Sequence, residues 1–175
     1  MRLSFAIFTA FSASVFAAPL AARTDVGLAK RQSVFSTKTY DEISISGGVA
    51  GNAEQEALDA LSGLNFNNLA SATQDDIAFL DSVNKICNEA EKNAFNVAID
   101  NASGEEAEAL QRGKIKNKVL KLEATMMRLM IDQAQGRDVA EKIEAESAKL
   151  NNNIQQDRDE AGKESTFLSF DASTS

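Results

Sequence analysis

A long segment between Ser103 and Gly136 limits the possible folds of this chain more than any other feature. Its apolar side chains recur at helical spacing in a broad arc made of Ile115, Val119, Leu120, Leu122, Met126, Met127, Leu129 and Ile131. An arc of this width indicates that one helix contacts more than one neighbour. We therefore expect a helix over 104–135 at the centre of an all-α fold.

The ends of this central helix carry recognisable signals. Ser103 and Glu106 have the spacing of a capping box, in which each side chain accepts a hydrogen bond from the other residue's backbone amide. Gly136 is suited to end the helix, because glycine adopts the left-handed conformation common after a last turn. Gly113 is a poor helix former, which predicts a kink or a fraying point there.

Three more helical patterns predict a small antiparallel bundle of about four helices after a short extended N-terminal arm. The first has apolar residues at Ala53, Ala57, Leu61 and Leu64. The second is expected over 74–101, with Thr73 and Asp76 as a capping box. The last is expected after an Asp138 cap, with a narrow apolar seam of Val139, Ile143, Leu150 and Ile154.

The segments that flank the bundle domain, 53–164, have different compositions. Residues 32–52 read as an extended, Gly-rich arm, in which the alternation of Ile43 and Ile45 predicts either a brief strand or an extended stretch. Residues 165–175 read as a flexible C-terminal tail. Alternatively, Phe167, Leu168 and Phe170 fold back over one end of the bundle.

The first residues predict secretion to the extracellular space. Arg2 is followed by an apolar run and by small residues, which is typical of a signal peptide over 1–17 with cleavage after Ala17. Residues 18–31 read as a pro-segment that ends at the dibasic pair Lys30 and Arg31. A membrane-spanning helix is the alternative, but the apolar run is shorter than the roughly 20 residues that a bilayer requires.

The net charge of the chain limits the kinds of partner that it can bind. From Gln32 onward the chain carries 14 Lys and Arg against 25 Asp and Glu, a net charge of −11. Nucleic acids and anionic membrane surfaces are bound through clustered basic residues, so neither is expected as a partner, and membrane insertion is not expected. An unknown extracellular protein or cell-wall component is the expected partner, and a monomer is the expected oligomeric state.

The residue types also narrow the chemistry. The chain contains no His, which excludes the Ser-His-Asp and Cys-His nucleophilic systems and most zinc sites. Its one cysteine, Cys87, lies on an apolar stripe and is expected to be a buried, free thiol, with an intermolecular disulfide or a reactive thiol as the alternative. The acidic residues fall on predicted solvent faces rather than as a pair across a sugar-binding cleft. We therefore expect no enzyme activity, no catalytic residues, no metal site and no cofactor.

Three groups of residues are candidate sites. Lys114, Lys118 and Lys121 lie on one face of the central helix and either form a docking patch or pair with acidic faces of the protein itself. Met126, Met127 and Met130 either line a groove for an apolar ligand or fill the core. Asn101 begins the sequence Asn-Ala-Ser, an acceptor for N-glycosylation, although Ser103 is also wanted as a helix cap.

Several segments resemble one family. They are 40–48, 50–53, the lysine-rich block 113–122, and 134–136. Together they look like uncharacterised small secreted proteins of filamentous ascomycete fungi. The resemblance covers most of the chain after the leader and implies an effector-like role, but it brings no activity or catalytic residues.

From these observations we expect a secreted, non-enzymatic helical protein that binds an extracellular protein or wall component. The alternatives are an extracellular carrier of a small apolar ligand and a structural protein of the cell surface or wall.

Overall fold

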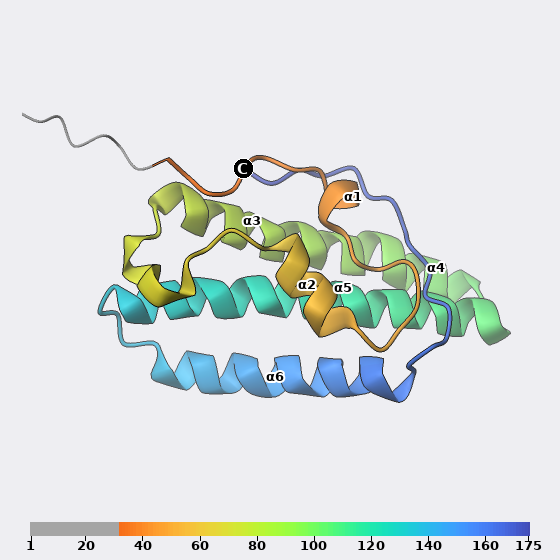
Figure 1. Ribbon diagram of the computed structural model, residues 1–175. Helices are drawn as coiled ribbons and strands as arrows, with labels where there is room; N and C mark the ends of the chain where they lie inside the picture. The colour runs from red at the N-terminus through yellow and green to blue at the C-terminus, as the bar shows by residue number, and fades with distance from the viewer. Residues whose placement is uncertain (1–31) are drawn as a thin grey trace, which may run out of the picture. The chain divides into compact units, whose positions relative to one another are not determined.

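The computed structural model describes residues 32–175, and this part of the chain is mostly helical (Figure 1). The elements in chain order are α1 (Tyr40–Ile43), α2 (Ala53–Ala60), the 3₁₀ helix η1 (Phe66–Ser71), α3 (Gln74–Ala90), the π turn η2 (Glu91–Phe95), α4 (Asn96–Asn101), α5 (Gly104–Ala134) and α6 (Ala140–Asp159). The predicted all-α class is therefore confirmed. Ala17, Lys30 and Arg31, the predicted processing residues, lie outside the described residues.

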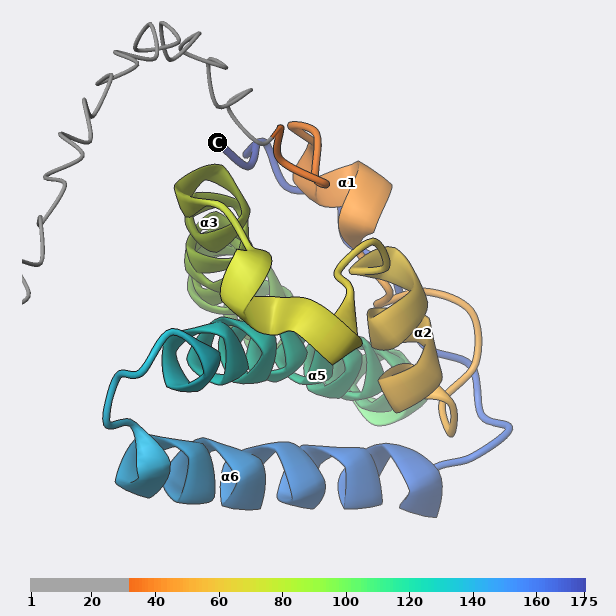
Figure 2. The same cartoon turned by 60° about the vertical axis from the view of Figure 1, so that its left-hand side comes forward.

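Helix α5 is the central element of this domain. Helices α3 and α6 lie on opposite sides of it, and α2 packs across it (Figures 1 and 2). Val119, Leu120 and Ile131 of α5 are fully buried, as expected for a helix with several neighbours. They share one core with residues of α2, α3 and α6.

Helix α3 continues through η2 into α4, so that residues 74–101 follow one helical path, as the sequence predicts. The Thr73 hydroxyl accepts from the Asp76 amide at 3.1 Å, and the Asp76 carboxylate accepts from the Thr73 amide at 2.8 Å, which confirms the capping box. The π turn adds a residue to this path and ends at the fully buried Phe95.

Two predicted helix caps are wrong. The Ser103 side chain makes no capping hydrogen bond to α5, because the chain enters this helix through Gly104 at a φ of +61°. Asp138 does not cap α6 either. The residue at that position is Val139, whose side chain has no acceptor.

Gly113 does not kink α5, which is helical on both sides of it. It is a site of close approach instead. A Cβ atom there would collide with the Thr166 carbonyl oxygen and lie 3.0 Å from the ring of Phe95. The Thr166 amide donates to the Ala109 carbonyl at 3.0 Å, so the C-terminal segment crosses α5 directly at this glycine.

Residues 165–175, for which the sequence predicts a flexible tail, form a C-terminal segment. It lies beside the N-terminal segment of the described domain, which leads into α1 (Figure 1). The Tyr40 amide donates to the Ala172 carbonyl and the Thr174 amide donates to the Lys38 carbonyl, each at 2.8 Å. Residues 40–43, near the alternation that suggested a strand or an arm, form the single helical turn α1.

Candidate functional site

A surface groove of about 700 Å³ lies where α4, the first half of α5 and the end of α6 meet. These parts of the three helices are toward the right-hand side of Figure 1. Its lining combines apolar and charged side chains: Ile99, Ala107, Glu108, Gln111, Arg112, Ile115, Gln156, Asp159, Glu160 and Lys163. Ile99 comes from α4, and the others come from α5 or from the end of α6 and the residues after it. Three of these ten residues are apolar and seven are polar or charged, so the groove offers apolar contact and charge side by side.

Arg112 is a groove residue whose charged side chain is held in place by the protein, and only 3% of its surface is exposed. Its Nε donates to the Glu164 carbonyl at 2.6 Å, its Nη1 pairs with Glu160 at 3.2 Å, and its Nη2 pairs with Glu105. Burial opposes the charge, but the hydrogen bonds to Glu105 and Glu160 outweigh it and raise the pKa of Arg112 above its ordinary value. Arg112 therefore joins the start of α5 to the segment after α6.

Glu160 and Lys163 form an ion pair of 2.8 Å at the edge of the groove. The hydrogen bond from Lys163, aided by Arg112, lowers the pKa of Glu160, and the same bond raises the pKa of Lys163. Both groups are therefore charged over the physiological pH range. With Glu108 and Asp159 also in the lining, the groove has three carboxylates against two cations and therefore a small excess of negative charge.

Comparison with known proteins places this chain in a family. The model of the family described as "Domain of unknown function (DUF8454)" matches residues 35–169, which is most of the chain. The chain belongs to the DUF8454 family. No curated protein and no solved structure matches it. The DUF8454 match spans α1 to α6 and every residue that lines the groove.

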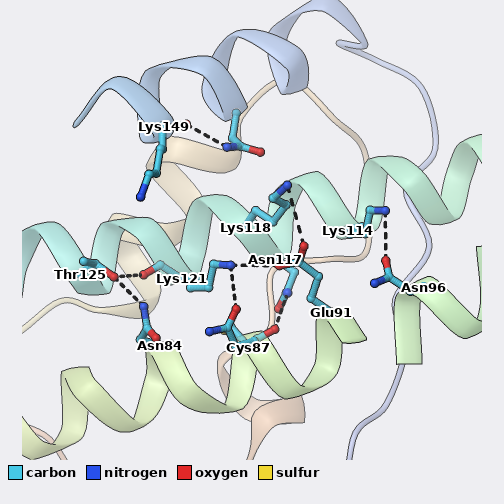
Figure 3. A network of polar contacts seen from close by, with 12 residues as sticks. Asn84, Cys87, Glu91, Asn96, Lys114, Asn117, Lys118, Lys121, Thr125 and Lys149 are labelled. Carbon is cyan, nitrogen blue, oxygen red and sulfur yellow. Dashed lines mark hydrogen bonds and ion pairs between the residues drawn. The ribbon is translucent and has the colours of Figure 1, made fainter. Parts of the chain in front are cut away.

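The three lysines of the predicted patch contact side chains of the DUF8454 domain itself (Figure 3). Lys121 lies 3.0 Å from a Glu91 carboxylate oxygen and Lys118 lies 3.9 Å from the other. Lys114 donates to the Asn96 side-chain oxygen at 3.2 Å. Lys118 and Lys121 thus pair with an acidic residue of the protein itself, whereas Lys114 contacts a neutral amide.

Lys116, which the helical spacing separates from the other three lysines, is fully buried. Its ammonium donates to the carbonyls of Gly47 at 2.7 Å and Val49 at 3.1 Å, and it pairs with Glu56 at 2.8 Å. The Gly-rich loop before α2 is therefore held against α5 by one lysine. The sequence gives no sign of this, because the partners lie about 60 or more residues away from Lys116.

The three methionines of the predicted ligand groove do not lie together in one groove but differ in their exposure to solvent. Met127 is buried in the core, Met126 packs against it, and Met130 is exposed. None of these three residues lines the groove described above. Asn101, the predicted glycosylation acceptor, is the exposed last residue of α4 and donates to the Val97 carbonyl at 2.7 Å.

Glu123 and Asp157 are among the buried carboxylates of the DUF8454 domain that the sequence does not predict. Glu123 on α5 is 7% exposed, and burial, with a smaller repulsion from Glu54, raises its pKa to about 7. Asp157 on α6 accepts from the first amide of α2, that of Ala53, at 2.9 Å, while its other oxygen has no hydrogen-bond partner. Helical spacing could have flagged Glu123, because it follows Val119 and Leu120 by one turn.

Residues 32–175 contain a single thiol, that of Cys87. Cys87 is a free, buried thiol, as predicted, and burial raises its pKa to about 12. Within this range no three Asp, Glu or Cys side chains are grouped so that they could hold a metal ion. The same range contains no helix that is long and apolar enough to span a bilayer.

Proposed function

We propose that this DUF8454 protein is a secreted, non-enzymatic binding module whose groove between α4, α5 and α6 holds a segment of an extracellular protein. The observation that carries the proposal is the groove itself, in which Ile99 and Ile115 lie among Glu108, Asp159 and Glu160. Apolar contact supplies affinity in such a groove, and the charged border selects the partner.

The proposed occupant is a protein segment that combines basic and apolar side chains. Carboxylates outnumber cations in the lining, and the chain from Gln32 onward carries an excess of 11 negative charges. Opposite charge on the partner would speed encounter and disfavour acidic competitors. A polysaccharide of the cell wall is a weaker candidate, because Tyr40 is buried and no aromatic side chain lines the groove.

The state of the groove carboxylates supports binding rather than catalysis. A general acid at neutral pH needs a raised pKa, but the pKa of Glu160 is lowered by its pairing with Lys163 and Arg112. Glu123, whose pKa is raised, is buried on α5 and does not line the groove. Arg112 is committed to Glu105, Glu160 and the Glu164 carbonyl.

Secretion and the fungal resemblance belong to the same proposal. The leader over 1–17 and the dibasic pair Lys30 and Arg31 support passage through a secretory pathway. The lysine-rich block 113–122 supports kinship with small secreted fungal proteins of effector-like role. We also propose that the domain is an antiparallel bundle of about four helices after an N-terminal arm, supported by the packing of α2, α3 and α6 on α5.

Photo-crosslinking from the groove tests the proposal. The full chain, carrying a photo-reactive residue in place of the groove residue Gln111, is secreted from its own leader, and the conjugate formed in the culture medium is identified by mass spectrometry. We expect a basic, apolar segment of one extracellular protein to be attached at Gln111. The double variant Glu108→Lys and Asp159→Lys should then weaken binding at least tenfold, since both carboxylates border the groove.

Glu141→Lys is the matched control, because Glu141 is an exposed acid at the opposite end of α6 from the groove. It should bind like the unaltered protein. Equal binding by the control and the double variant would contradict the groove as the docking site. An apolar small molecule that co-purifies with the protein would favour the carrier alternative, and retention on the producing cell's wall would favour the structural one.

A further inference from the structure

The turn between α4 and α5 presents the chain's one Asn-X-Ser/Thr sequence, Asn101-Ala102-Ser103. Asn101 and Ser103 are exposed, and the backbone is extended at Ala102 and Ser103. N-linked glycans are bulky and polar, so a folded domain can carry them only where the asparagine side chain is exposed to solvent. The end of a helix before an extended turn meets this condition.

Neither Asn101 nor Ser103 makes a contact that a glycan on Asn101 would have to break. The Ser103 hydroxyl does not cap α5, so the structural demand that could compete for it is absent. The Asn101 Nδ2 donates to the Val97 carbonyl at 2.7 Å, a bond within the same helix. An amide nitrogen that carries a sugar retains one hydrogen, so this bond is compatible with the modified side chain.

An exposed apolar side chain lies on the same face of α4 as Asn101. Val97 is 52% exposed, one of the large apolar side chains in residues 32–175 that are left in solvent. It lies four residues before Asn101 in α4, and residues at this spacing share one helix face. A glycan on Asn101 would extend from the same helix face as Val97.

We propose that Asn101 carries an N-linked oligosaccharide, and this inference rests on the proposed secretion. In the transfer, the Asn101 Nδ2 loses a proton and forms a bond to the anomeric carbon of a lipid-linked oligosaccharide pyrophosphate. The bond from that carbon to the pyrophosphate oxygen breaks, and the lipid pyrophosphate leaves. The glycan then stands at the end of the helix that contributes Ile99 to the groove.

Intact mass of the full chain, secreted from its own leader by a fungal host, tests the proposal. The protein in the medium should be heavier than its polypeptide, and peptide-N-glycosidase should remove the excess and convert Asn101 to Asp. Asn101→Gln and Ser103→Ala should each abolish the excess mass, whereas Ser103→Thr should retain it, because Thr also completes the acceptor sequence.

Thermal unfolding of the enzymatically deglycosylated proteins supplies the folding control. Ser103→Ala should melt within a degree or so of the parent, because Ser103 caps nothing. Secreted parent protein with the bare polypeptide mass would overturn the glycan and leave the proposed secretion standing. Protein retained inside the cell without a glycan would overturn both.

Discussion

Glu123 lies in surroundings that differ from those that its side chain prefers in water. It is mostly buried on α5, and this burial, with a smaller repulsion from Glu54 on α2, disfavours the ionised carboxylate. A carboxylic acid that stays protonated in the folded state loses less on burial than its ionised form. Glu123 therefore makes the stability of the domain depend on pH.

We predict that Glu123 lowers stability as pH rises. Its folded pKa of about 7 lies above the ordinary value of 4.5, so the folded state binds more protons between these two values. Stability should fall across that interval by at most about 3 kcal/mol, and by less because solvent screens part of the carboxyl group, and it should not change further above the interval. Glu123→Gln should remove most of this slope in urea titrations at a series of pH values. Glu144→Gln, at an exposed position of α6, should leave the slope unchanged.

Substitution of Lys121 distinguishes a docking patch from an internal ion pair. It contacts both Asn88 and Glu91 at 3.0 Å, and both charged side chains of the Glu91 pair are mostly shielded from solvent. Lys121→Glu would place two carboxylates together, so we predict a loss of about 1–2 kcal/mol in unfolding free energy with partner binding largely intact. An unchanged melting temperature with abolished partner binding would restore the docking patch.

At the scale of the element, Gly113 shows how one missing methyl group permits two segments to meet. In an ordinary helix interior, Gly→Ala stabilises by up to about 1 kcal/mol. Here the added Cβ would meet the Thr166 carbonyl and the Phe95 ring, so we predict that Gly113→Ala destabilises the protein by about 1–3 kcal/mol. Faster hydrogen exchange of the Thr166 amide should accompany the loss. A gain in stability would show that the tail does not pack there in solution.

Local patterns predicted the helices well and their surroundings poorly. The long helices at 74–101 and 104–134 follow from apolar periodicity, and the Thr73 cap follows from neighbouring residues, because these effects act within a few residues. The predicted Ser103 cap is wrong because capping also depends on the backbone angles of Gly104. Gly113 was misread because its reason is a segment more than fifty residues away.

The candidate groove was invisible in the sequence for the same reason. Its residues come from α4, α5 and the end of α6, and no spacing rule relates Ile99 to Lys163. Arg112 was not singled out, since a buried arginine is recognised only once its carboxylate partners are in place. Helical spacing groups Lys114, Lys118 and Lys121 on one face, but it does not show that Glu91 is the partner of Lys118 and Lys121.

At the scale of the whole described domain, the two terminal segments complete the core together. The Phe170 ring lies edge-on to Tyr40, with ring centroids 5.9 Å apart, and Asp41 accepts from the Phe170 amide at 3.0 Å. We predict that deletion of residues 169–175 lowers the unfolding free energy by about 2–3 kcal/mol, because Tyr40 and its surroundings become exposed.

Two single substitutions serve as a matched pair for this prediction. Phe170→Ser should reproduce most of the loss, while Phe167→Ser should have a small effect, because Phe167 is one of the exposed apolar residues of this segment. Denaturant unfolding of both variants checks the difference. Equal losses would mean that the segment stabilises the domain through its backbone hydrogen bonds rather than through the Phe170 ring.

Tyr40 gives this protein an optical property that follows from its position. The chain contains one tyrosine and no tryptophan. The Tyr40 hydroxyl donates to Asn117 at 2.9 Å, and the Asn117 amide donates to the Cys87 carbonyl at 3.0 Å, so the ring stands where the terminal segments, α5 and α3 join. Burial raises the pKa of Tyr40 to about 12. Below that pH, Tyr40 ionises only when the surrounding structure opens, so the appearance of phenolate absorbance measures the rate of this opening without any label. Near-ultraviolet circular dichroism would likewise come largely from this one ring.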